Sequence, residues 1–269
     1  MIRPQEGAGA VYQTIELEHR DGVSSVTLSR PPLNLITMTM LEELQAAFDL
    51  LEARRETRAV LLVGKGSRAF CAGADLTRES EHTPSAGRDF REAGRRVVER
   101  IESFPKPVVS AVRGWCIGGG TGLAWPADIR IASTTAKYRA GDVYLGLIPT
   151  WSVGMVRLVH YIGRNRTLDL LMLGRDIDAS RALELGLVSM VVPDDAFERE
   201  TAEVMARLAS GAPLPFQAIK EAVRAQARDG LDRAALIEEE WSQRILASSD
   251  AHEGMTAFLE KRKPKFRGE

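Results

Sequence analysis

Apolar and polar residues alternate near the start of the chain, and this pattern predicts a β-hairpin. The alternation covers residues 14–20 and 23–28, which flank Asp21-Gly22, a dipeptide typical of tight hairpin turns. From Thr37 or Thr39 to about Glu52, apolar residues recur every three or four positions, which predicts an amphipathic helix capped by a threonine hydroxyl. The expected buried face of this helix consists of Leu41, Leu44, Phe48 and Leu51.

Continuous apolar runs further along the chain predict buried strands at residues 59–63, 107–112 and 129–132. A helix that ends near Ser103 is expected between the first two. Strands and helices that alternate in this way are typical of an α/β fold with a largely parallel sheet, whose ligands bind at the carboxyl ends of the strands. Shorter strands are expected at 137–139 and 187–192. Loops are expected at 78–88 and at 141–149, and the first of these is expected to be mobile.

The pattern becomes mostly helical towards the C-terminus. We therefore expect a core of residues 1–195, which carries the ligand site, followed by a helical region of residues 196–269. From residue 152 onward, helices are expected at 152–161, 164–173, 179–185, 196–209, 215–228, 231–248 and 251–261.

Composition narrows the class of protein. Hydrophobic residues make up 44% of the 269 residues, the net charge is −1 and the pI is about 6.5, so neither nucleic acid nor a membrane is expected as a partner. The two cysteines, Cys71 and Cys116, are too few for a disulfide scaffold and are expected to be reduced, which favours the cytoplasm. Residues 1–10 lack the apolar stretch of a signal peptide and are expected to form a flexible lead.

Two turns rich in small residues are the candidate chemical site. One contains Gly73 and Ala74 and follows the strand at 59–63, and the other contains Gly118, Gly119 and Gly120 and follows the strand at 107–112. Glycine lets backbone approach a ligand closely, and a backbone N–H at a helix start can bind an oxygen that becomes anionic. One N–H from each turn would form an oxyanion hole. Close packing of helix against strand is the competing explanation for glycine at either turn.

Other kinds of site lack their sequence patterns. The chain has no phosphate-binding G-x-x-x-x-G-K-[ST] motif, no complete G-x-G-x-x-G motif and no G-x-S-x-G nucleophile motif. Its four histidines, His19, His82, His160 and His252, are scattered, so no metal site is expected.

Several segments together resemble the crotonase superfamily, the enoyl-CoA hydratases and isomerases. The most specific are residues 70–76 (Phe-Cys-Ala-Gly-Ala-Asp-Leu), 106–112 (Lys-Pro-Val-Val-Ser-Ala-Val) and 117–120 (Ile-Gly-Gly-Gly). The resemblance extends from about residue 13 to 267 through further segments at 30–34, 127–132, 145–149, 179–188 and 254–262.

The resemblance implies a spiral of repeated β-β-α units, with C-terminal helices that assemble a homotrimer or a dimer of trimers. It implies an acyl-CoA substrate, so coenzyme A belongs to the substrate and no separate cofactor is expected. The backbone N–H groups of Ala74 and Gly119 would then form the oxyanion hole, with Asp142 as the catalytic acid or base. The expected substrate-binding residues are Arg30, Leu33, Ala72, Asp75, Leu76, Gly118, Gly122, Tyr144, Trp151, Phe258 and Lys261.

Two departures from the family pattern affect the expected reaction. Hydratases of the family carry two glutamates that position and activate water, and here the corresponding positions hold Gly122 and Asp142. One acid is therefore missing and the other is one methylene shorter. Tyr144 and Trp151 would reshape the acyl pocket or simply pack in the core.

We expect an enoyl-CoA hydratase, a lyase, with a variant set of acids. Competing hypotheses are an enoyl-CoA isomerase with a single carboxylate, a CoA-thioester hydrolase or decarboxylase, and an acyl-CoA binder without efficient catalysis.

Overall fold

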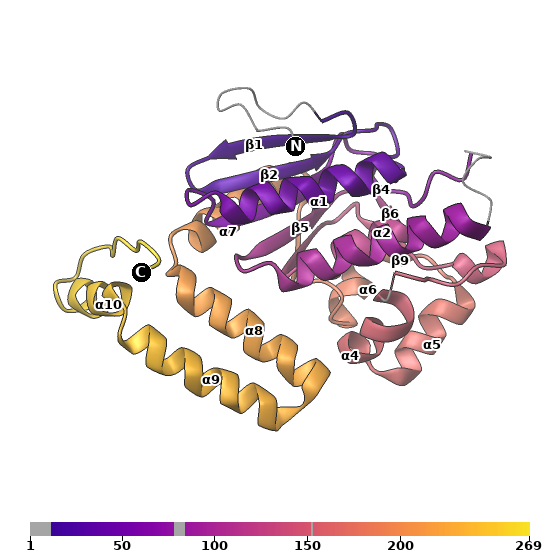
Figure 1. The fold of residues 1–269 in the computed structure, drawn as a ribbon. Helices are drawn as coiled ribbons and strands as arrows, with labels where there is room; N and C mark the ends of the chain where they lie inside the picture. The colour runs from indigo at the N-terminus through magenta and orange to yellow at the C-terminus, as the bar shows by residue number, and fades with distance from the viewer. Residues whose placement is uncertain (1–11, 78–83, 152) are drawn as a thin grey trace, which may run out of the picture.

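Two sheets and a set of helices around them form the part of the chain described by the computed structural model, residues 12–77, 84–151 and 153–269 (Figure 1). In these residues a six-stranded sheet has the order β1-β2-β3-β5-β7-β10, and a four-stranded sheet has the order β4-β6-β8-β9. The strands are β1 Ile15–Arg20, β2 Val23–Leu28, β3 Ala59–Gly64, β4 Ala69–Cys71, β5 Val108–Val112, β6 Trp115–Ile117, β7 Ile129–Ser133, β8 Lys137–Arg139, β9 Ile177–Asp178 and β10 Met190–Val192.

Helices surround both sheets and continue beyond them. The α-helices are α1 Met38–Ala53, α2 Pro84–Ser103, α3 Gly119–Ala124, α4 Leu158–Ile162, α5 Arg164–Leu173, α6 Ala179–Glu184, α7 Phe197–Ala209, α8 Pro213–Asp229, α9 Leu231–Leu246 and α10 Ser249–Leu259. Short helices of other types are the 3-10 helices η2 Asp142–Leu145 and η4 Asp194–Ala196 and the π-helix η3 Val153–Arg157.

The chain visits the two sheets in turn, which confirms the expected spiral of β-β-α units. Strands β3, β5 and β7 lie in the large sheet, and each is followed at once by a strand of the small sheet: β4, β6 and β8. The predicted hairpin is also confirmed, because β1 and β2 pair antiparallel across Asp21-Gly22, while β2, β3, β5, β7 and β10 run parallel. Successive units therefore place the carboxyl ends of corresponding strands side by side.

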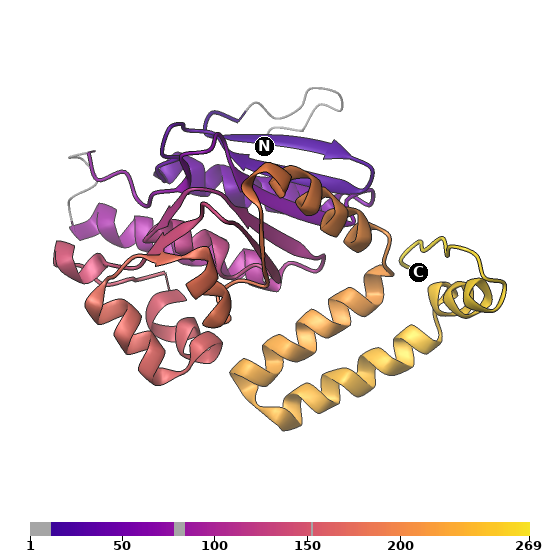
Figure 2. The ribbon, with the colours of Figure 1, turned by 180° about the vertical axis from the view of Figure 1, so that it is seen from behind.

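The large sheet buries a different core on each face. On one face, inward residues such as Val26 and Leu62 pack against α1 and α2, and the predicted apolar face of α1 is fully buried there. The hydroxyl of Thr37 accepts the Met40 N–H and caps α1, as the sequence predicts. On the other face, α7 covers a smaller core that includes Phe197, as the view from behind shows (Figure 2).

The helices α8, α9 and α10 form an arm that projects from the sheets (Figures 1 and 2). The arm has a small core of its own, in which Trp241 and Ile237 pack between α8 and α9. Lys220 ties α8 to the core through an ion pair with Asp128. Helix α7 packs on the large sheet, and the projecting arm begins only with α8. The expected division of the chain into a core of residues 1–195 and a helical region of residues 196–269 stays a prediction.

The short strand β4 lies in a trough that only glycine permits. Its backbone approaches three glycines of neighbouring elements so closely that no side chain would fit, because real Cβ contacts below 3.0 Å essentially do not occur. A Cβ atom added to Gly64 would lie 2.3 Å from the Phe70 carbonyl oxygen, one on Gly114 2.3 Å from that of Arg68, and one on Gly120 2.2 Å from that of Cys71. The trough therefore sets where β4 and the turn after it can lie.

Two local expectations from the sequence were wrong, and most of the small sheet was missed. The expected strand at 137–139 is confirmed as β8, whereas β4, β6 and β9 were not predicted, because they are two or three residues long and show no periodicity. The expected loop at 78–88 overlaps α2, which starts at Pro84, a residue well suited to a helix start, and the expected loop at 141–149 contains η2. Residues 78–83 and the expected flexible lead at 1–10 lie outside the described residues.

No helix in the described residues is long and apolar enough to cross a membrane.

Gly120→Ala tests the trough. The added methyl group would collide with the Cys71 carbonyl, so we expect a loss of about 3 kcal/mol in the free energy of unfolding, measured by urea denaturation. Gly87→Ala in α2 is the matched control. Among the described residues, a Cβ atom there would meet the Arg91 guanidinium alone, at 3.7 Å, so this variant should be neutral or slightly more stable. Equal losses in the two variants would contradict the role of the trough.

Candidate active site

The two small-residue turns lie next to each other at one end of the small sheet. Strands β4 and β6 are parallel neighbours, with Cys71 opposite Cys116, and each turn follows its strand directly. A Cβ atom on Gly73 would lie 3.1 Å from the Ile117 carbonyl oxygen and 3.9 Å from the Gly119 nitrogen. The turn of Ala74 and the turn of Gly119 thus meet at the carboxyl ends of parallel strands, where α/β proteins bind their ligands.

Backbone N–H groups in both turns are left for a ligand. Ile36 forms an isolated bridge with Ala74: the Ile36 N–H donates to Gly73 and the Ile36 carbonyl accepts from Asp75, so the N–H of Ala74 faces away from this bridge. Gly119 is the first residue of α3, where a helix has no internal acceptor for its N–H. Neither N–H donates to a backbone carbonyl of the described residues.

Glycine is required by the shape of both turns. Gly73 has φ +99° and Gly118 has φ +50° with ψ −114°, backbone conformations that residues with a side chain rarely adopt. The Gly118 N–H donates to the Arg139 carbonyl of β8 at 3.0 Å. This bond holds the second turn against the strand that leads to Asp142.

Asp142 lies beside the second turn. Its Oδ1 is 3.6 Å from the position of a Cβ atom on Gly118, and its Oδ2 is buried without a hydrogen-bond partner among the described residues. Burial raises the pKa of Asp142 above the ordinary value of an aspartic acid. A carboxyl group with a raised pKa and an oxygen without a partner, beside the Gly118 turn, is suited to accept and return a proton.

Trp151 fills the space on the other side of the second turn. Its indole lies 3.1 Å from the position of a Cβ atom on Gly122 and 3.1 Å from that on Gly119, and its ring centroid is 5.6 Å from that of Phe90. The space in which an acidic side chain at position 122 would stand is therefore occupied by an aromatic ring. Gly122 and Trp151 therefore fit each other in volume.

Arg30 and Asp75 pair with each other beside the first turn. Arg30 donates to the Leu35 carbonyl at 2.7 Å and to Asp75 Oδ2 at 3.1 Å. The hydroxyl of Thr77 donates to Asp75 Oδ1 at 2.6 Å. This hydrogen bond from Thr77, together with Arg30, lowers the pKa of Asp75. Both side chains thus hold the Ala74 turn, and the substrate contact that the sequence indicates for them stays a prediction.

The other expected binding residues fall into two groups. Leu33, Ala72 and Leu76 lie at the first turn, where the Ala72 N–H donates to the Leu33 carbonyl and Leu76 is exposed. Tyr144 points away to α5, because its hydroxyl donates to the Met172 carbonyl and its ring lies against Gly174.

Phe258 belongs to α10 and Lys261 follows it directly, and α10 lies at the far end of the arm, away from β4 and β6 (Figure 1). Phe258 is 82% exposed.

Three residues near the turns were missed by the sequence analysis: Ile36, Phe90 and Gly94. A Cβ atom on Gly94 would lie 2.2 Å from Trp151 Cε2, so Gly94 belongs to the seat of the indole. A glycine within an amphipathic helix is destabilising without a packing reason, and this was the available signal. In the described residues no three His, Cys, Asp or Glu side chains are grouped as metal ligands would be.

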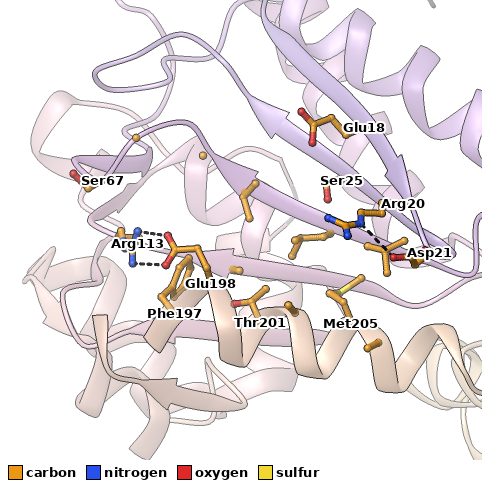
Figure 3. A pocket seen from close by; sticks show the side chains of 18 residues that line it. Glu18, Arg20, Asp21, Ser25, Ser67, Arg113, Phe197, Glu198, Thr201 and Met205 are labelled. Carbon is orange, nitrogen blue, oxygen red and sulfur yellow. Dashed lines mark hydrogen bonds and ion pairs between the residues drawn. The ribbon is translucent and has the colours of Figure 1, made fainter. Parts of the chain in front are cut away.

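A groove of about 830 Å³ lies elsewhere, between α7 and the outer face of the large sheet (Figure 3). Its floor is apolar and includes Leu61 and Met205. On its rim, Arg113 is already paired with Glu198, which leaves it less suited to hold a charged ligand. We therefore place the candidate site at the two turns and not in this groove.

Comparisons with known proteins agree on one family. Residues 18–269 match the profile of the family described as enoyl-CoA hydratase/isomerase. The chain is 36% identical over 252 residues to a "Probable enoyl-CoA hydratase" of Bacillus subtilis, covering 92% of this chain and 96% of the relative. It is 34% identical over 248 residues to a "Short-chain-enoyl-CoA hydratase" of Clostridium acetobutylicum, and the match covers 92% of this chain and 95% of the relative.

Solved structures agree as well. The crystal structure of an enoyl-CoA hydratase from Bacillus anthracis superposes with a TM-score of 0.91 at 33% identity, covering 96% of this chain and 100% of that chain.

Asp75→Asn tests the clamp on the first turn. Because the pKa of Asp75 is lowered in the folded state, its charge stabilises the fold above the ordinary pKa of aspartic acid, and this contribution is lost as the pH falls through the lowered value. We expect the variant to lose about 1–3 kcal/mol of unfolding free energy at pH 7, and the difference from wild type to shrink as the pH falls below about 4. Urea denaturation across this range measures both.

The exposed Asp169 of α5 gives the control, since Asp169→Asn removes the same charge outside the clamp. A difference for Asp75→Asn that stays constant with pH would contradict a role for its charge.

Proposed function

The chain belongs to the enoyl-CoA hydratase/isomerase family, and we propose that it adds water to the double bond of an enoyl-CoA thioester. The observation that carries the proposal is the meeting of the Ala74 and Gly119 turns beside Asp142. Relatives named as hydratases over more than nine-tenths of the chain support the same reaction. The proposed enzyme is a lyase.

The proposed oxyanion hole uses the backbone N–H groups of Ala74 and Gly119. When a nucleophile attacks the β-carbon of an enoyl thioester, negative charge moves to the thioester oxygen as an enolate. Two N–H groups already aimed at that oxygen stabilise the charge without reorganisation, and a single such donor contributes roughly 3 kcal/mol. The position of Gly119 at the start of α3 adds the positive end of the helix dipole.

In the proposed mechanism, Asp142 moves the proton. Its carboxylate takes a proton from water as the water oxygen bonds to the β-carbon, and the protonated acid then gives this proton to the α-carbon as the enolate collapses. The product gains one water and Asp142 returns to its starting form. The free, buried Oδ2 and the raised pKa of Asp142 support this double role.

A second candidate reaction is isomerisation of the double bond. It needs one carboxylate to carry a proton between two carbons, and the observation that favours it is the indole beside Gly122, which leaves Asp142 without the second acid. An oxyanion hole can also serve hydrolysis or decarboxylation of a thioester, or binding without turnover, and the products of the reaction distinguish these from hydration.

Several expectations from the sequence stay predictions. We propose that coenzyme A enters as part of the substrate, with no separate cofactor, and that the protein works in the cytoplasm. We further propose a homotrimer or a dimer of trimers. The projecting arm supports assembly, because it carries Phe258 and Lys261 away from the site of its own chain and leaves them for a neighbouring copy.

A panel of enoyl-CoA and 3-hydroxyacyl-CoA thioesters, analysed by mass spectrometry and chromatography, tests the reaction. Hydration adds the mass of water, isomerisation moves the double bond without a change of mass, and hydrolysis releases free coenzyme A. Isomerisation alone would replace the first proposal by the second.

Asp142→Asn should lower kcat/KM for crotonyl-CoA hydration by about 10²-fold to 10⁴-fold, with little change in the affinity for butyryl-CoA. In the wild type, kcat/KM should fall on the acid side, because the base must be ionised. The midpoint of this fall should lie above the ordinary pKa of aspartic acid. Steady-state kinetics across pH measure both effects. Asp169→Asn is the control, and wild-type turnover by Asp142→Asn would remove Asp142 from the mechanism.

A further inference from the structure

The seat of Trp151 is built from glycines of two helices. Gly94 belongs to α2, while Gly119 and Gly122 belong to α3. A Cβ atom on Gly94 would lie 2.2 Å from Cε2 of the indole, well inside contact distance, so alanine is excluded there while the ring keeps its place. Glycine within a helix costs stability relative to alanine, and here it makes room for a flat ring.

One edge of this ring, at Cη2, borders the proposed oxyanion hole. A Cβ atom on Gly119 would lie 3.1 Å from Cη2 of Trp151 and 3.0 Å from Cδ1 of Ile36. Ile36 is also the bridge partner of Ala74. The indole and Ile36 therefore form an apolar wall beside both N–H donors.

The same ring closes the space behind the wall. Its Cε3 is 3.1 Å from the position of a Cβ atom on Gly122, and the Phe90 ring packs against it from α2. Trp151 is only 7% exposed, and its indole lies directly against Gly119 and Gly122 of α3. A broad ring wedged between two helices has little freedom to move aside.

From this geometry we infer that Trp151 sets the depth of the acyl pocket and restricts the enzyme to short acyl chains. The inference rests on the proposed function, because it takes the thioester oxygen to bind at Ala74 and Gly119. With the carbonyl held there, the carbons beyond the double bond reach the indole within a few bonds. A longer chain must displace a ring that three glycines hold in place.

Binding of saturated acyl-CoA thioesters tests the inference without turnover. Titration calorimetry with butyryl-, hexanoyl- and octanoyl-CoA measures the affinity of wild type and of Trp151→Ala. In the wild type we expect affinity not to rise with chain length. In Trp151→Ala each methylene that enters the opened space should raise affinity about fourfold, so octanoyl-CoA should bind at least tenfold more tightly than butyryl-CoA.

A matched pair of milder variants keeps the test sound if Trp151→Ala does not fold. Trp151→Phe shortens the ring at the wall and should shift the preference partway towards hexanoyl-CoA. Trp125→Phe makes the same change at a buried tryptophan that stacks on Tyr138 instead, and should leave the chain-length profile unchanged. Thermal melts establish that each variant is folded.

The possible outcomes separate the inference from the reaction. Parallel chain-length profiles for the wild type and both Trp151 variants would overturn the inference and leave the hydratase standing. A shifted profile with no hydration of any enoyl-CoA would support the inference and overturn the reaction. No binding of any CoA thioester by the wild type would overturn the proposed function and the inference with it.

Discussion

Close approach of backbone to backbone organises this protein. The segment of β4 passes over Gly64, Gly114 and Gly120 at distances that leave no room for a Cβ atom. Packing of this kind depends on shape and not on hydrophobic area, since a single methyl group would push the segment out of the trough. The small sheet, whose strands are only two or three residues long, is held against the large sheet in this way. The two turns of the site are the direct continuation of that contact.

The site follows from this arrangement. Because β4 and β6 are parallel neighbours that end at the same level, the backbone at Ala74 and at Gly119 is brought together without the help of any side chain. Side chains enter as supports. Arg30 and Asp75 hold one turn, and the bond from Gly118 to β8 holds the other and brings Asp142 alongside. The proposed oxyanion hole can stabilise an enolate whichever proton transfer accompanies it, so it supports the proposed substrate class more narrowly than the proposed reaction.

The pocket beside the second turn is shaped by an aromatic ring and by glycines. The absence of a side chain at Gly122 makes room for the large ring of Trp151, and Gly94 completes the seat of the ring. Restoring a glutamate at position 122 would therefore set its side chain against the indole. Among the described residues, Asp142 is the carboxyl group beside the Gly118 turn, and an apolar ring lies where the resemblance implies a second carboxylate.

The sequence by itself determined the family, the hairpin, the parallel strands of the large sheet and the capped helix α1, since these depend on local periodicity, turn residues and distinctive glycine patterns. It also located both turns and Asp142. Only the tertiary structure decided what Arg30, Asp75 and Trp151 contact, because their partners come from distant parts of the chain. Of the small sheet, the sequence predicted only the strand at 137–139, which is β8. Strands β4, β6 and β9 were out of reach, because two or three residues show no periodicity and glycines far apart in the chain hold β4 in place.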